Sequence, residues 1–138
     1  MDKKDIMEFW KVNSDFLSDL NISFYNEFER ISNKDENYVV IGDDYGTKLC
    51  ISEKTNAVVS IDVESISIRF INSNIKSFLN FLQIYFTRRL ELSNADDEEA
   101  IEIVKSIRDN FNMLDSSALN DEDNWWSVIL EQTEQGLL

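Results

Sequence analysis

Carboxylates are the side chains through which this chain could do acid–base or metal chemistry. The sequence has no His, which removes the commonest general base at neutral pH and the commonest metal ligand. One Cys and no His leave only carboxylates for a zinc ion, so we expect no zinc site. Cys50 lies between Leu49 and Ile51, which favours a structural strand residue over an activated nucleophile. The sequence therefore predicts no catalytic residue, no metal site and no cofactor.

The segment Gly-Asp-Asp-Tyr-Gly at 42–46 places two adjacent carboxylates in a tight turn. It lacks the spaced acids of a calcium loop, and it lacks the Lys and the length of a phosphate-binding loop. Acids in such a segment are typical turn formers, and Gly42 is expected to be structural. The alternative to a purely structural turn is a contact surface, and we predict that Asp43, Asp44 and Tyr45 contact a partner.

Four consecutive acids form a second candidate patch, Asp96, Asp97, Glu98 and Glu99. Negative charge in the first turn of a helix is favoured by the helix dipole, which explains the run structurally. The alternative is a docking patch for a basic partner, and we predict partner contact for all four residues.

The net charge of the whole chain is −14, and its pI is near 4.2. Nucleic-acid binding depends on Lys and Arg that neutralise phosphates, so we expect no direct binding to DNA or RNA. The acidity could serve solubility alone. It could also face a basic partner, because complementary fields speed encounter and set specificity.

The acid is concentrated in residues 91–123, which hold eleven acids against Lys105 and Arg108 and carry −9 of the total −14. Such a concentration costs self-repulsion, which a cationic partner would relieve. We predict further partner contacts at Asp62, Glu64, Asp121, Glu122 and Asp123. Trp125 and Trp126 could both pack in the core, which is the default for a final helix. Two adjacent Trp residues on a helix point in different directions, so the alternative, which we predict, is Trp126 in the core and Trp125 as an interface anchor.

The 138 residues fit a single domain over 1–138, since 43% are apolar and no Pro-rich or Gly-rich linker divides them. No apolar run approaches the ~20 residues of a membrane span, and the charged N-terminus does not resemble a signal peptide. A lone Cys cannot form an internal disulfide. These features favour a cytoplasmic protein without a membrane partner.

The pattern of elements predicts the fold class. Residues 5–32 are expected to be irregularly helical, with a new helix starting near Asn13 and capped by Ser14, and 32–37 to be a loop. Short alternating segments between residues 38 and 70 predict antiparallel strands with one covered face and one wetter face. A helix is expected over 75–86, and Asn72, Ser73 or Asn74 could cap it. A second helix is expected to 114, with its cap and four acids of its first turn supplied by 94–99, and a third from 125 to a stop at Gly136. The order predicts an α+β fold, a mostly antiparallel sheet with helices packed against it.

Three short motifs are Tyr-Val-Val-Ile-Gly-Asp-Asp at 38–44, Ile-Ser-Glu-Lys-Thr-Asn-Ala-Val-Val-Ser-Ile-Asp at 51–62, and Phe-Ile-Asn-Ser-Asn-Ile-Lys-Ser-Phe at 70–78. These motifs resemble the SUKH superfamily, and most nearly SUKH family 4. The elements at 16–23 and 126–131 are also similar to the family pattern. Asn56 stands where a Gly is common, and Asn21 and Ser23 replace a Gly and a Pro.

The resemblance implies a bacterial immunity protein that binds a cognate polymorphic toxin, often a nuclease, and that has no catalytic residues. It implies that Phe70 and Phe78 pack the sheet–helix junction and that Asn72 and Ser73 cap the helix. One alternative is a regulatory or scaffold protein without a toxin target. Another is a carboxylate enzyme, which would need a concave pocket and acids of raised pKa. The oligomeric state stays open, with a monomer favoured.

Overall fold

The computed structural model describes residues 3–138, and Met1 and Asp2 lie outside the described residues. Its sheet has five antiparallel strands whose spatial order is the order in the sequence, β1-β2-β3-β4-β5. The strands are β1 (Ile22–Asn33), β2 (Glu36–Asp44), β3 (Thr47–Ser52), β4 (Val58–Asp62) and β5 (Ser67–Asn72). The expected α+β class is confirmed.

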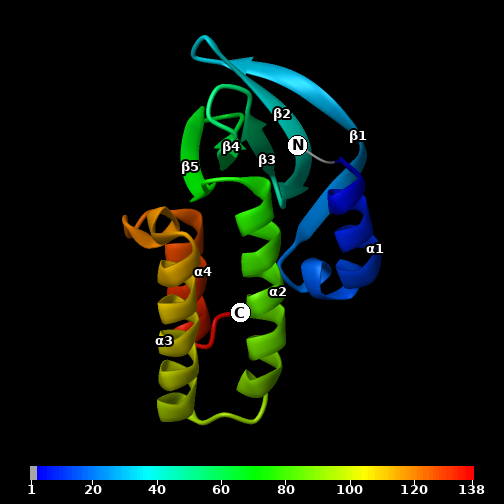
Figure 1. The fold of residues 1–138 in the computed structure, drawn as a ribbon. Coiled ribbons are helices and arrows are strands. Elements are labelled where there is room, and N and C mark those ends of the chain that lie inside the picture. The colour runs from blue at the N-terminus through cyan, green and yellow to red at the C-terminus, as the bar shows by residue number, and fades with distance from the viewer. Residues whose placement is uncertain (1–2) are drawn as a thin grey trace.

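The helices lie against one face and one edge of this sheet (Figure 1). They are α1 (Lys3–Asp19), α2 (Ile75–Leu92), α3 (Asp97–Leu114) and α4 (Trp125–Glu134), with a short 3-10 helix η1 (Ser116–Leu119) before α4. α1 packs on β1, whereas α2 and α3 form a hairpin that runs away from the sheet, with α4 packed on α3. None of the helices within residues 3–138 is long and apolar enough to span a membrane.

The expected helix over residues 5–32 is wrong in its second half, because α1 ends at Asp19 and Ile22–Asn33 is strand β1. Asn21 reverses the chain with a φ of 60°. The segment 32–37 is a tight hairpin rather than a loop, since Lys34 and Asp35 both have positive φ, as a two-residue hairpin turn requires. Pairing with β2 decides the outcome, and this partner is not visible in local periodicity.

α1 contains the break that the sequence predicted near residue 13. Asn13 has non-helical angles, and its buried side chain donates from Nδ2 to the Phe9 carbonyl at 3.2 Å. The two halves nevertheless run on as one kinked helix.

Both faces of the middle strands are buried, which corrects the expected wet face. The main core lies between the sheet and the helices, and Val58 belongs to it. A second cluster on the opposite face consists of Tyr38, Val40, Cys50, Val59 and Ile61. The alternation also fails near the end of the sheet, where Val63, Ile66 and Ile68 are 55%, 50% and 40% exposed. β4 ends at Asp62, so Val63 and Ile66 belong to a turn and Ile68 to an edge strand.

The helical part of the core is aromatic. Phe81 of α2 stacks on Phe111 of α3 with ring centroids 3.8 Å apart, and the Trp126 ring contacts both. The face of α2 toward this core consists of Phe78, Phe81, Leu82, Tyr85 and Phe86, which are all buried. Gly136 has a φ of +75° just after the end of α4, as expected for a glycine that ends a helix.

Candidate functional site

Three of the predicted partner residues, Asp62 at the end of β4 and Asp121 and Asp123 on the loop before α4, lie together at one corner of the molecule. A hollow of about 580 Å³ beside β5 is lined by three carboxylates and one guanidinium, Asp62, Asp121, Asp123 and Arg69. Thr47 and Ser60 add polar groups to its wall. An excess of acid over base in a concave surface creates a negative field that attracts cations.

A second hollow of about 660 Å³ lies beside the same strand and shares Phe70, Asp121 and Asn124 with the first. Glu36, Tyr38 and Val59 are among its other lining residues, and no Lys or Arg lines it in the part of the chain described. Lys54 at 3.9 Å from Glu36 is the nearby cation. We call the two hollows, with the 117–124 loop between them, the acidic corner.

The β4–β5 turn is held by the Asp62 side chain. Its Oδ1 accepts hydrogen bonds from the backbone N–H groups of Glu64 and Ser65 at 3.0 and 3.4 Å. These bonds favour the ionised form and lower the pKa of Asp62. The Ile66 N–H donates to the Asp62 carbonyl at 2.8 Å, and Ile66 has a φ of 60°, which a β-branched residue rarely adopts.

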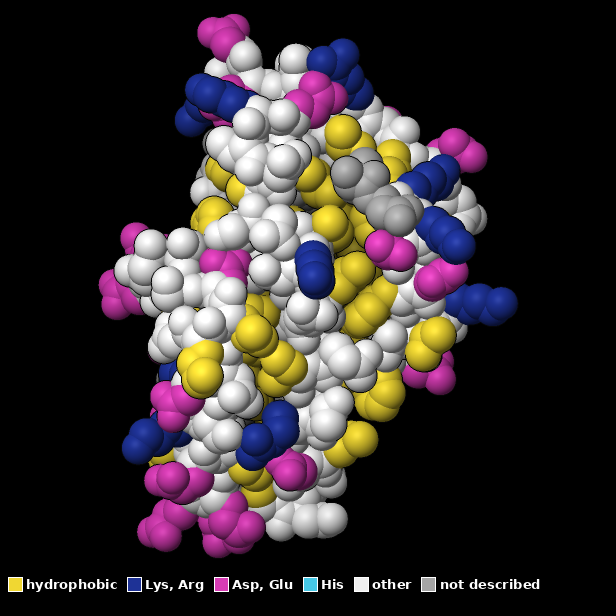
Figure 2. Space-filling view, viewed as in Figure 1, with side chains coloured by type: hydrophobic (Ala, Val, Ile, Leu, Met, Phe, Trp, Pro, Cys, Tyr) yellow, Lys and Arg dark blue, Asp and Glu magenta, His cyan; other side chains and the backbone are white. Residues whose placement is uncertain are grey.

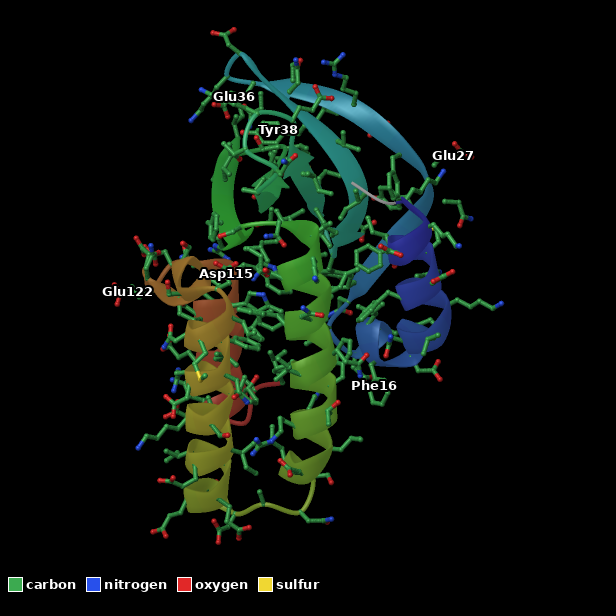
Figure 3. All side chains as sticks on the ribbon, in the orientation of Figure 1. Phe16, Glu27, Glu36, Tyr38, Asp115 and Glu122 are labelled. Atoms are coloured by element: carbon green, nitrogen blue, oxygen red, sulfur yellow. The ribbon has the colours of Figure 1, made fainter. Side chains whose placement is uncertain are left out.

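The loop before α4 is held in a similar way. Asp121 Oδ1 accepts from the Asp123 N–H at 2.9 Å, and the Asp121 carbonyl accepts from Ser127 Oγ at 2.8 Å. Buried Asn124 donates from Nδ2 to the Ser117 carbonyl and to Asn120 Oδ1. The carboxylate of Glu122 projects outward from this loop (Figure 3). Three adjacent acids are therefore presented on a loop fixed by its own hydrogen bonds.

The remaining predicted residues lie elsewhere. Asp96, Asp97, Glu98 and Glu99 begin α3 at the far tip of the α2–α3 hairpin, where Figure 2 also shows acidic side chains gathered. Asp43 accepts from the Tyr25 hydroxyl at 2.6 Å, and Tyr45 is 85% exposed beside another hollow lined by α1 residues. Glu64 is exposed on the β4–β5 turn. The structure thus divides the predicted surface into separate patches.

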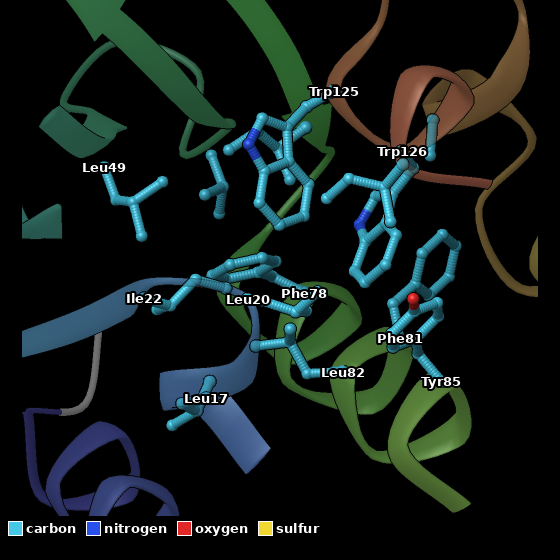
Figure 4. Close-up of a cluster of buried hydrophobic side chains, with 14 of the residues drawn as sticks. Leu17, Leu20, Ile22, Leu49, Phe78, Phe81, Leu82, Tyr85, Trp125 and Trp126 are labelled. Atoms are coloured by element: carbon cyan, nitrogen blue, oxygen red, sulfur yellow. The ribbon is translucent and has the colours of Figure 1, made fainter. Parts of the chain in front are cut away.

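Trp125 lies in the core, which corrects its expected role as an exposed anchor. Only 4% of it is exposed, and its ring lies edge-on to Phe78 (Figure 4). The sequence argument was right that Trp125 and Trp126 point differently. The argument did not foresee that both side chains are covered, Trp125 by the sheet and Trp126 by the α2–α3 hairpin. The Trp125 indole N–H donates to Asp44 at 2.9 Å, so its role here is to hold Asp44.

Asp44 is the partly buried carboxylate of this region. Burial raises its pKa most, and the nearby charge of Asp43 acts in the same direction. The hydrogen bond from Trp125 and the charge of Arg69 oppose this rise without cancelling it.

Cys50 is fully buried, and this burial raises the pKa of its thiol to about 12. It is therefore protonated at neutral pH and not activated as a nucleophile. Among residues 3–138, no three His, Cys, Asp or Glu residues are grouped so that they could hold a metal ion.

A comparison with protein-family models matches residues 8–132 to the SUKH-4 immunity protein family. The chain belongs to the SUKH-4 immunity protein family. Comparisons with curated proteins and with solved structures found no match. The match covers the sheet, the helical hairpin and most of α4, so the family assignment concerns the whole fold described above.

The motif residues of this SUKH-4 protein join the sheet to the helices. Asn72 is fully buried, and its Oδ1 accepts from the Trp126 indole at 2.9 Å. Its Nδ2 donates to Asp115 Oδ2 at 3.1 Å. The Ser73 N–H and hydroxyl both donate to Asp115 at 2.8 Å. The resemblance implied that Asn72 and Ser73 cap α2, and this is wrong, because both side chains bond to Asp115 or Trp126 instead. Asn74 caps α2, accepting from the Ser77 N–H.

Asp115 is the residue that sequence reasoning missed. It is 8% exposed and ends α3, where the helix dipole disfavours an anion. That unfavourable position was the one local signal that Asp115 has donors elsewhere. Its donors lie more than forty residues earlier in the chain, so no local pattern could name them.

The other motif residues serve packing. Phe78 is fully buried between Phe24 and Trp125, and Phe70 is half-buried between the two hollows. Gly42 lies where β1 approaches closely, and a Cβ there would be 2.2 Å from the Ser23 carbonyl oxygen. Gly42 is required by space, as expected for a structural glycine.

Replacement of Asp115 is expected to destabilise the fold strongly. Asp115→Ala leaves the Asn72 amide and both Ser73 donors without their acceptor, so we expect a loss of about 2–4 kcal/mol in the free energy of unfolding. Asp115→Asn keeps one acceptor oxygen and should lose less. Chemical denaturation measures both, with exposed Asp109→Ala on α3 as the control, expected within about 0.5 kcal/mol of wild type. Equal stabilities for Asp115→Ala and the control would contradict this role.

Asp44→Asn is expected to stabilise the protein at neutral pH. The raised pKa means that ionised Asp44 destabilises the folded state above that pKa, and that this cost disappears as the pH falls to the ordinary carboxyl value. Asparagine keeps an acceptor for Trp125 without the charge. The gain over wild type should shrink as thermal melts move from pH 7.5 toward pH ~4. Asp44→Ala removes the acceptor and should instead lose about 1–3 kcal/mol. A gain that grows on acidification would refute the assignment.

Proposed function

We propose that this SUKH-4 protein binds and neutralises a cognate protein toxin, a basic nuclease domain, through the acidic corner. The observation that carries the proposal is that Asp62, Asp121 and Asp123 line one hollow in which Arg69 is the one cationic side chain among the described residues. The chain that presents this hollow is a member of an immunity protein family. Neutralisation is by stoichiometric binding in the cytoplasm, with no nucleic acid, membrane or cofactor involved.

The chemistry of a nuclease supports this choice of partner. A protein that binds a phosphate backbone presents Lys and Arg, so its functional surface is basic. A concave acidic surface can occupy it, and close charge pairs in such complexes contribute up to several kcal/mol. The same acidity repels nucleic acid, so the inhibitor does not bind the substrate of the nuclease.

The ionisation of Asp62 supports binding rather than catalysis. A carboxylic acid that transfers protons at neutral pH needs a raised pKa. The pKa of Asp62 is lowered by its backbone hydrogen bonds, so this lining residue stays charged. Asp44, whose pKa is raised, is tied to Trp125 and is not among the residues that line either hollow.

Co-expression tests the proposed function. A bacterial host carries a toxin domain of a nuclease under one inducible promoter and this chain under another. We expect the chain to restore growth and to co-purify with the toxin domain as a 1:1 complex. Growth arrest despite saturating amounts of the chain, with no complex on size-exclusion chromatography, would overturn the proposal for that toxin.

A matched pair of charge reversals tests which acidic patch makes contact. Glu122→Lys with Asp123→Lys alters the acidic corner, and Asp97→Lys with Glu98→Lys alters the hairpin tip. Each pair changes the net charge equally, and all four side chains are exposed. Asp96 is left in place because its side chain caps α3.

The two pairs are expected to differ in binding kinetics. α3 spans 18 residues, about 27 Å, whereas charges are screened over ~8 Å at physiological salt. The corner pair should slow association and weaken affinity at least ~10-fold, and the tip pair should act on association mainly at low salt. Surface plasmon resonance at two salt concentrations measures this. A tip pair that is as damaging as the corner pair at physiological salt would contradict contact at the corner.

A further inference from the structure

The sheet has two free edges, and they differ in protection. β1 carries a register irregularity between Phe24 and Glu29 and is packed by α1, with Glu29 and Arg30 along its outer half. Irregularities, charges and covering elements are the usual means by which an edge avoids pairing with another chain. This edge of the sheet is therefore protected.

β5 is the other edge. η1 and α4 pack against β5, and its second half, from Phe70 to Asn72, is half-buried or buried. Its first half, Ser67–Arg69, is exposed and has neither a covering element nor a register irregularity. β5 pairs with β4 on its inner side, and within residues 3–138 no backbone hydrogen bond from another segment occupies its outer side. Its exposed residues are Ser67, Ile68 and Arg69, so a partly exposed isoleucine lies on an open edge with a single charge beside it. A strand of this kind is a template for an added strand.

The turn that leads into β5 exposes two apolar side chains, and the backbone of one of them is strained. Val63 and Ile66 are 55% and 50% exposed, and Ile66 has a φ of 60° although it is β-branched. Strained residues persist where the surrounding structure holds them, and they cluster at ligand-contact sites. Here the Asp62 carboxylate and carbonyl hold the turn. Packing within this chain leaves half of Ile66 exposed.

The two hollows of the acidic corner are both lined by β5 residues. Ser67, Ile68 and Arg69 line one hollow, and Phe70 lines both. The side chains of an extended segment alternate between its two faces, so a strand beside β5 would send successive side chains toward different hollows. Carboxylates line each hollow, Asp62 and Asp123 in one and Glu36 in the other.

We propose that an extended basic segment of the toxin adds to β5 as a sixth strand, with Lys or Arg side chains in the two hollows and apolar contacts to Ile66 and Ile68. This inference rests on the proposed function and names how the toxin is held. A second copy of this chain is disfavoured as the occupant, because it would bring the same carboxylates against one another. Main-chain hydrogen bonds provide the affinity, and the acidic hollows select a basic sequence.

Amide hydrogen exchange with the co-expressed toxin domain tests the added strand. In the 1:1 complex, those amides of residues 67–70 that point away from β4 should exchange at least ~10-fold more slowly than in the free protein, whereas the amides of residues 30–33 on the β1 edge should be unchanged. Unchanged exchange at 67–70 in a stable complex would overturn strand addition and leave the immunity function standing. No complex with the wild-type chain would overturn both.

Two variants separate binding from folding. Ile68→Thr keeps a β-branched side chain but removes apolar contact, and it should weaken toxin binding about tenfold. Val12→Thr, on α1 and 80% exposed in the wild type, is the matched control and should bind normally. Ile66→Gly suits the positive φ, so it should raise the melting temperature while weakening the complex. Wild-type affinity for both Ile68→Thr and Ile66→Gly would refute contact at this edge.

Discussion

The buried hydrogen bonds around Asp115 join three parts of the fold that are distant in sequence. Asp115 caps the end of α3, Asn72 is the last residue of β5 and Ser73 follows it, and Trp126 lies in the first turn of α4. Buried polar groups are costly unless each finds a partner, so only an arrangement that brings these elements together is stable. The aromatic cluster around Trp126 contributes burial, and the hydrogen bonds select the register of that packing.

This junction also determines where the acids are displayed. With α3 held at the end of β5, the chain needs only η1 and a short loop to reach α4, and that loop must pass beside β5. Asp121 and Asp123 therefore face Asp62 across the edge of the sheet. Grouping like charges costs free energy in the isolated protein. A basic partner would recover that cost on binding, which is consistent with an immunity protein whose active form is a complex.

The same region concentrates the local departures from a stable sheet. The exposed first half of an edge strand, exposed aliphatic side chains and a β-branched residue in the left-handed region occur within eight residues, 62–69. The opposite edge has charges and a covering helix, so the fold can protect an edge. Features that cost stability in the free protein and occur together are typical of a binding surface.

The sequence by itself determined the α+β class, the three C-terminal helices, the stop at Gly136, the acidity and the resemblance to SUKH family 4. Each of these depends on local periodicity, capping chemistry, composition or short motifs. Tertiary structure alone decided that 22–33 is a strand, because its hydrogen bonds are made with 36–44. It alone decided that Trp125 is buried, that Asp115 accepts from Asn72, and that Asp62 and Asp121 line one hollow while Asp97 lies at the far tip of a hairpin. Contacts between distant residues depend on packing, and no local pattern encodes them.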